Sequence, residues 1–375
     1  MAQKVQYLQR TQVALIFLAF AVLTVPLSVI QLSAGVPGSV KRWLMVFYLF
    51  LVGNTHFAIT WALYLNSANL RHFGSTAARK LIYFAVPIAI MIMFFALGVL
   101  EIPAEGTAIA IWFFAAVTAT DYFHAVRQSF GVLQMFKGRA GPGAFPRSLV
   151  RADNLYFLAL WILQIITFLN GTEKGFDGRF EWSNVPAKIM LGVAGALAFV
   201  VLRGFARAWR TEKIDRGAVL VALGYFALQS ASAWLVVYRS RLYFASLAMH
   251  YVEYHVLMVP RCFRAELDPS SGVDRVAAWF RRHKVVFYGA VVLVAAIVSS
   301  APLLSLVGTQ VTRDDRFGWL LVNLLGGIFV AHYFVEAFVW KFSQPFYRET
   351  LTPLYSAVPA QAAERSPAPA LAPTG

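Results

Sequence analysis

Long apolar stretches alternate with short polar segments along most of the chain, a pattern typical of a bundle of transmembrane helices. A run of about 18 or more apolar residues is long enough for a helix to cross the hydrocarbon core of a bilayer. Ten stretches approach or exceed this length, at residues 13–35, 43–66, 81–100, 107–128, 155–171, 187–203, 217–237, 242–260, 284–307 and 318–341. We therefore expect an all-α, multi-pass membrane protein with one transmembrane domain over residues 1–345.

Basic residues lie mostly in segments that fall on one side of the predicted membrane. With the N-terminus inside, the cytoplasmic segments contain 24 of the 33 lysines and arginines. Because cytoplasmic loops of membrane proteins retain Lys and Arg, both termini are predicted to be cytoplasmic, in the cytoplasmic membrane of a bacterium. This topology accounts for the net charge of +15, so no nucleic-acid partner is expected.

The C-terminal residues 346–375 follow the last apolar stretch and form a predicted cytoplasmic tail. From residue 356 onward the tail is mostly alanine and proline with almost no large apolar side chain. Such a composition buries too little apolar surface to fold, so we expect disorder from about residue 356.

Titratable side chains occur at mid-membrane depth in the second, fourth, eighth and tenth predicted spans, all of which run from outside to inside. A carboxylate at membrane depth costs roughly 2.5–3.5 kcal/mol on insertion scales, so buried groups of this kind indicate a functional site. The helical rise per residue places the histidines in one slab on the cytoplasmic side of the midplane. The eight residues are His56, Asp121, His124, His250, Glu253, His255, His332 and Glu336.

Two of these spans pair a carboxylate with a histidine on one helix face. Asp121 and His124 are three residues apart, and His332 and Glu336 are four apart, so each pair projects toward one side. A carboxylate in that position either binds the metal itself or accepts the imidazole N–H and fixes the ring.

The eighth span raises a geometric difficulty. His250 and Glu253 share a face, but His255 follows His250 by five residues, about 140° away around a regular helix. Either a π-bulge realigns the two rings, or they serve different centres, or only one is a ligand.

Imidazoles and carboxylates without thiolates favour particular metals. The chain has a single cysteine, Cys262, which excludes sites that need several thiolates. Nitrogen and oxygen donors suit iron, zinc or manganese. We expect all five histidines to bind metal and the three carboxylates to act in catalysis. The expected cofactor is iron, including a di-iron centre, with zinc or haem b as alternatives.

The layout of histidines in these four spans resembles that of the membrane-bound, histidine-rich di-iron desaturases and hydroxylases. The chain contains neither the HxxxH nor the HxxHH box of that family, so no family residue is transferred by motif. The resemblance implies a metal-dependent oxidoreductase that acts on a lipid or lipophilic substrate from the membrane. Since the sequence has no haem-attachment, flavin or nicotinamide motif, such an enzyme requires an external electron donor or reductase.

A proton- or ion-coupled transporter is the alternative from another class, because intramembrane His, Asp and Glu also form proton relays. Histidines on different helices also hold b-type haem, which makes an electron carrier a further alternative.

Overall fold

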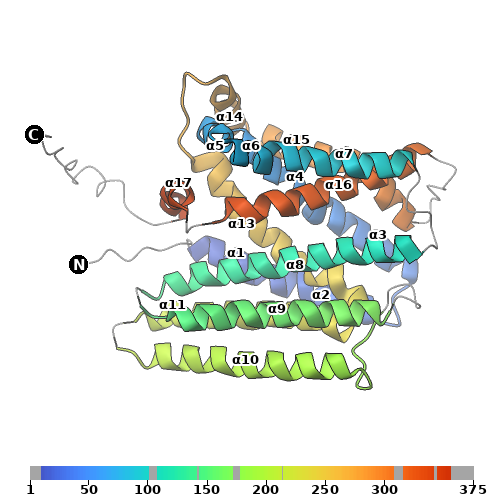
Figure 1. Ribbon diagram of the computed structural model, residues 1–375, viewed down its shortest axis with the longest axis vertical. Coiled ribbons are helices and arrows are strands. Elements are labelled where there is room, and N and C mark those ends of the chain that lie inside the picture. Colours follow the sequence, from blue (N-terminus) through green and yellow to red (C-terminus); the bar gives the residue numbers. More distant parts are fainter. Residues whose placement is uncertain are drawn as a thin grey trace, which may run out of the picture.

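Helices form nearly all of the computed structural model, which describes residues 10–100, 108–141, 143–171, 178–212, 214–307, 316–341 and 344–355 (Figure 1). Within these ranges the only strand-like pairing is an isolated bridge between Arg179 and Arg239. The prediction of an all-α bundle is therefore confirmed.

The helices follow one another along the chain with short connections. Three π-helical turns, at Phe20–Thr24, Leu49–Gly53 and Leu81–Ala85, and a 3₁₀ turn at Trp61–Tyr64 interrupt or extend the N-terminal helices. The α-helices are α1 (Arg10–Ala19), α2 (Val25–Leu32), α3 (Gly38–Tyr48), α4 (Asn54–Thr60), α5 (Ser67–Gly74), α6 (Ala77–Lys80), α7 (Val86–Val99), α8 (Ala108–Gly138), α9 (Arg147–Leu169), α10 (Val185–Trp209), α11 (Arg216–Tyr238), α12 (Tyr243–Ser246), α13 (Ala248–Arg264), α14 (Gly272–Arg282), α15 (Lys284–Val307), α16 (Arg316–Val339) and α17 (Pro345–Tyr355).

Six continuous helical segments of the described chain are long and apolar enough to cross a membrane. They are Arg10–Leu32, Gly38–Tyr64, Ala77–Val99, Arg147–Leu169, Val185–Trp209 and Arg216–Tyr238. The other four predicted spans coincide with α8, with α12 and α13, with α15 and with α16. The structure thus supports a membrane protein, while the count of ten spans and the N-in/C-in topology stay predictions.

Local sequence explains two of the three π-helical turns. Pro26 and Pro87 each lie just after such a turn, near the start of the following α-helix. Proline has no N–H to donate to the preceding turn, and a wider turn relieves the clash of its ring with that backbone. The turn at Leu49–Gly53 has no proline after it and leads directly into α4.

The bundle has two groups of helices with α1 and α13 between them (Figure 1). In one group α8, α9, α10 and α11 lie side by side; in the other α7 and α15 pack against α16. The helices α8, α13 and α16 run toward the side of the bundle that also holds α5, α14 and α17.

A buried ion pair connects α8 with α9. Lys137 Nζ lies 2.7 and 2.6 Å from the two carboxylate oxygens of Asp153, and neither side chain is more than 3% exposed. Gln134 Nε2 donates to the same carboxylate at 3.1 Å. The Lys137 ammonium also lies over the rings of Phe145 and Phe205. The pair joins the two helices inside the protein, where solvent does not screen it.

Helix α17 packs part of the predicted tail against the bundle. Tyr347 shares a 2.7 Å hydrogen bond with Tyr83, and the Tyr355 hydroxyl donates to the carbonyl of Leu257. Residues 346–355 are thus helical and partly buried, and the remainder of the tail lies outside the described residues.

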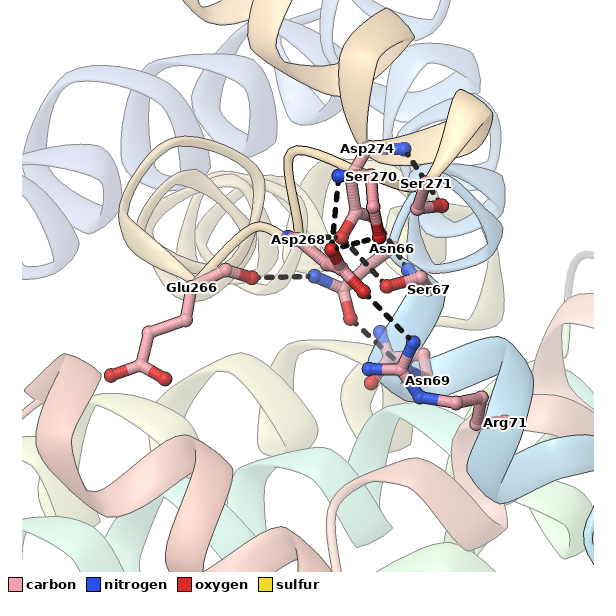
Figure 2. A network of polar contacts seen from close by, with 9 residues as sticks. All are labelled: Asn66, Ser67, Asn69, Arg71, Glu266, Asp268, Ser270, Ser271 and Asp274. Atoms are coloured by element: carbon pink, nitrogen blue, oxygen red, sulfur yellow. Dashed lines mark hydrogen bonds and ion pairs between the residues drawn. The ribbon is translucent and has the colours of Figure 1, made fainter.

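A polar network joins the start of α5 to the segment between α13 and α14 (Figure 2). The buried Asp274 carboxylate accepts hydrogen bonds from the N–H and hydroxyl of Ser67, at 2.6 and 2.7 Å, and from the N–H of Asp268 at 2.7 Å. Asp268 accepts from Ser270 and pairs with Arg71 at 3.5 Å. We call this network the polar clamp.

Because of the polar clamp, we expect the folding stability of the protein to depend on pH. Burial raises the pKa of Asp274, but the hydrogen bonds from Asp268 and Ser67 outweigh it, so the pKa lies below its ordinary value. A carboxyl with a lowered folded-state pKa stabilises the protein above its unfolded pKa, about 3.9, and loses that contribution as the pH falls through the folded value. We expect Asp274→Asn to destabilise the protein by about 1–3 kcal/mol at pH 7 because it leaves buried donors unpaired.

Melting temperatures in detergent between pH 3 and pH 7 measure this effect. Asp274 has a higher pKa in the unfolded chain than in the folded protein. As the pH falls from the first value to the second, Asp274→Asn should lose less stability than the wild type. An equal loss in both proteins would show that Asp274 does not contribute to the acid sensitivity.

Candidate metal centre

Four helices bring four histidine rings together inside the bundle. His56 lies on α4, His124 on α8, His250 on α13 and His332 on α16, and all four are buried. The ring centroid of His56 lies 4.8 Å from that of His332, 5.0 Å from His250 and 6.1 Å from His124. These residues span most of the chain length, so only the tertiary fold assembles the cluster.

Three of these rings have the spacing of a metal site. One nitrogen each of His56, His124 and His332 lies within 4.8 Å of the other two. The Nε2 atoms of His56 and His332 are 3.1 Å apart. Metal–nitrogen bonds of about 2.0–2.1 Å place two donors of one ion about 3–4 Å apart. The longest separation in the triad therefore needs to contract by about 1–2 Å to hold an ion.

The fourth ring lies beside the triad. The centroid of His250 is 5.3 Å from that of His124, and its Nδ1 has no hydrogen-bond partner. His56 Nδ1 and His124 Nε2 are also buried without a hydrogen-bond partner. Buried imidazole nitrogens are normally hydrogen-bonded, so these three nitrogens are available as donor atoms for a ligand of the cluster.

The π-helical turn at Leu49–Gly53 directly precedes the turn of α4 that carries His56. Gly53 permits this path, because a Cβ there would lie 3.1 Å from the ring of Tyr251 on α13. An extra residue in one turn rotates everything that follows by about 100° relative to a regular helix. The turn thereby sets the direction of His56 within the cluster.

Glu336 and Thr60 surround His332 and His124. Glu336 Oε2 lies 3.4 Å from His124 Nε2, and Glu336 Oε1 lies 3.8 Å from His332 Nδ1. The Thr60 hydroxyl is 2.6 Å from His332 Nδ1 and 2.7 Å from the Tyr254 hydroxyl. With Nδ1 held by Thr60, His332 presents Nε2 to the centre of the cluster. Such partners fix the ring orientation of metal-binding histidines.

His255 does not join the four rings. Helix α13 is a regular α-helix through this region, without the realigning π-bulge. His255 Nε2 instead lies 3.1 Å from the hydroxyl of Thr55 on α4. Of the alternatives that the sequence left open, the structure places His255 in a separate contact next to the cluster.

Glu253 faces away from the histidines, toward α8 and α11. It is fully buried, and its carboxylate accepts hydrogen bonds from Gln128 at 3.4 Å and Gln229 at 3.3 Å. The hydroxyl of Tyr225 also contacts it. Glu253 therefore forms a second polar cluster with these residues, separate from the metal candidates.

Asp121 lies one turn before His124 on α8, and its carboxylate faces tyrosines from two other segments. Tyr333 on α16 and Tyr243 on α12 interact with it. Asp121 and His124 are one turn apart on α8, as their spacing predicts, but the two side chains contact different neighbours.

A small cavity lies between α8, α9, α11, α12 and α13. Its volume is about 30 Å³, and it is lined by His250 and by polar side chains of α9, α11 and α12. Two of these, Gln164 and Ser232, have a buried oxygen without a hydrogen-bond partner. A polar cavity of this volume holds about two waters.

Two residues of the centre escaped the sequence interpretation. Tyr254 links Thr60 to Glu336, and Arg261 lies further along α13 with its guanidinium over Trp340. Tyr254 follows His250 by four residues and so shares its helix face, which was an available signal. Aromatic residues are too common in these helices for that spacing to stand out.

No known family model, curated protein or solved structure matches this chain. Function is therefore inferred from the site itself.

Proposed function

We propose that His56, His124, His250 and His332, with Glu336, bind one transition-metal ion inside the membrane. The observation that carries this proposal is the triad of buried imidazoles from three helices, with one nitrogen of each within 4.8 Å of the others. Burying several unpaired imidazoles beside a carboxylate is costly unless the groups bind something. A cation satisfies the free nitrogens and the charge of Glu336 together.

Five donors of this type suit iron, zinc or manganese, and iron is the proposed metal. We propose one ion and not two, because Asp121, Glu253 and His255 contact other residues. A b-type haem fits the geometry less well. The Nε2 atoms of His56 and His332 are 3.1 Å apart and in direct contact, so no space for a porphyrin lies between these two rings.

The proposed activity is oxidation of a lipid or lipophilic substrate at this ion. A redox-active metal in a water-poor, apolar bundle favours substrates that enter from the bilayer. The histidines would hold the metal, and Glu336 lies where it can take or return a proton. Dioxygen would be the oxidant, and an external reductase would supply the further electrons needed to reduce it to water. Gly326 and Gly327 let α16 approach α7 closely, since a Cβ at Gly327 would lie 2.9 Å from Phe94.

Metal analysis of the detergent-purified protein tests the proposal. One iron per chain without a Soret band is the expected result. Zinc in place of iron would redirect the function to hydrolysis, and a Soret band would indicate haem. A metal-free protein that takes up solute or protons in liposomes would replace the enzyme with the transporter alternative.

Glu336→Gln provides a sharper prediction for the same centre. The amide keeps the shape of Glu336 but removes the negative charge beside His124 and His332. We expect metal affinity to fall by at least roughly 10–100-fold, because the loss of a group that only orients a ligand already has that effect. Competition with a chelator of known affinity measures it. Unchanged affinity would place Glu336 outside the metal centre.

A further inference from the structure

Arg261 is a buried cation near the C-terminal end of α13. Its side chain is only 8% exposed, and a guanidinium stays charged at any pH a protein survives. Its Nη1 has no hydrogen-bond partner, and in the described part of the chain no carboxylate lies within ion-pair distance of it. The guanidinium carbon lies 4.7 Å from the centre of the Trp340 ring, and this cation–π contact stabilises the buried charge.

A buried charge without a counter-ion is unfavourable, and an aromatic face offsets only part of that cost. Glu336 interacts with Arg261 electrostatically, but from beyond ion-pair distance. Its two oxygens lie next to His124 and His332 instead. The guanidinium therefore lacks the direct anionic partner that buried arginines normally have.

Arg261 lines a hollow near this end of the bundle. The walls include Arg281, Asn66 and Asn69 together with apolar side chains such as Met258 and Phe287. The hollow has a volume of about 20 Å³, room for a single oxygen-sized atom. Arg281 is held in place by a 2.9 Å hydrogen bond from its Nε to the carbonyl of Cys262.

The polar clamp keeps nearby carboxylates engaged elsewhere. Asp274 accepts hydrogen bonds from Ser67 and Asp268, and Asp268 pairs with Arg71. Figure 2 shows the Glu266 carboxylate pointing away from this network, while its backbone carbonyl accepts from Asn66. The hollow is thus bordered by two cations whose charges these carboxylates do not neutralise directly.

We propose that this hollow binds one oxygen of an anionic headgroup, a phosphate or carboxylate, on a membrane amphiphile. Its apolar walls favour an amphiphile over a free anion. If the proposed function holds, the substrate of the metal centre is an anionic membrane amphiphile of this kind. Along α13 the Cα atoms of Arg261 and His250 are about 16 Å apart, and the Arg261 side chain interacts electrostatically with Glu336 beside the cluster. The histidines are therefore within reach of an acyl chain, which spans about 15 Å in one leaflet. A headgroup held at Arg261 lets its chain reach the histidines.

Native mass spectrometry of the full-length protein tests the headgroup site. The probes are phosphatidylglycerol, dodecanoate, phosphatidylcholine and inorganic phosphate. We expect one bound phosphatidylglycerol or dodecanoate per chain and weaker binding of the other two. Arg261→Gln should weaken anionic amphiphile binding by about tenfold or more, because it removes a charged hydrogen bond. Arg264→Gln, an exposed residue three positions along the same helix, is the matched control and should change it less than about twofold.

Equal binding by wild type and Arg261→Gln would overturn the headgroup site, as would inorganic phosphate binding as tightly as the amphiphiles. Arg281→Gln gives a second reading if Arg261→Gln fails to fold. The same titration on His332→Ala protein separates the two proposals. Amphiphile binding that persists in a protein without a metal centre supports the headgroup site even where the metal proposal fails.

Discussion

Replacing His332 with alanine is expected to leave the purified protein almost without metal. His332 provides the Nε2 that lies 3.1 Å from that of His56, and it contacts Thr60 and Glu336 as well. The substitution removes one donor nitrogen and also the ring that Thr60 and Glu336 contact. His56→Ala and His124→Ala should have the same effect, because ligands that act as a unit are not additive. Metal content per folded chain, measured after gel filtration, checks the prediction.

His283→Ala is the matched control. His283 is exposed after the end of α14, with its ring against Trp279, and contacts none of the four clustered rings. Its variant should retain full metal content. If all three cluster variants also kept full occupancy, the metal centre proposed here would not exist, and the buried histidines would serve helix packing.

Asp153→Ala should produce the largest loss of stability. The substitution leaves the Lys137 ammonium, 3% exposed, without the carboxylate that it contacts through both oxygens. Breaking a buried ion pair from one side costs about 3–5 kcal/mol, because the remaining charge stays buried. The rings of Phe145 and Phe205 offset part of that cost. Thermal unfolding in detergent, followed by circular dichroism, measures the change.

A double variant distinguishes the buried charge from a general packing defect. Lys137→Met with Asp153→Leu removes both charges and retains most of the volume, so it should recover most of the stability lost in Asp153→Ala. If the double variant is no more stable than Asp153→Ala, the loss comes from packing and from the freed Gln134.

The positions of the histidines along the helices were predictable, because burial cost and helical rise depend on local sequence. The rings of His56, His124, His250 and His332 do lie close together inside the bundle, which agrees with the expectation that these histidines share one slab. The face that each carboxylate presents was harder to predict. Glu253 shares a face with His250 by spacing, yet it turns toward Gln128 and Gln229, which lie on helices that no pattern connects to α13.

The π-helical turn at Leu49–Gly53 illustrates the other limit. For the five-residue separation of His250 and His255, a π-bulge in α13 was one of three alternatives. Helix α13 is regular, and the π-helical turn lies in the chain before His56. No proline marks it, and its fit depends on Gly53 lying against Tyr251. Contacts of this kind arise from tertiary packing, so one helix's sequence does not contain them.

The spread of the four histidines along the chain has a consequence for biosynthesis. His56 is made early, whereas His332 and Glu336 follow in the last long helix, α16. Until α16 has packed into the bundle, the earlier histidines lack the partners that later surround them, and the proposed set of donors is incomplete. The proposed metal would therefore be loaded only after α16 has been made, and a chain truncated before α16 should be recognised by membrane quality control through its unpaired polar groups.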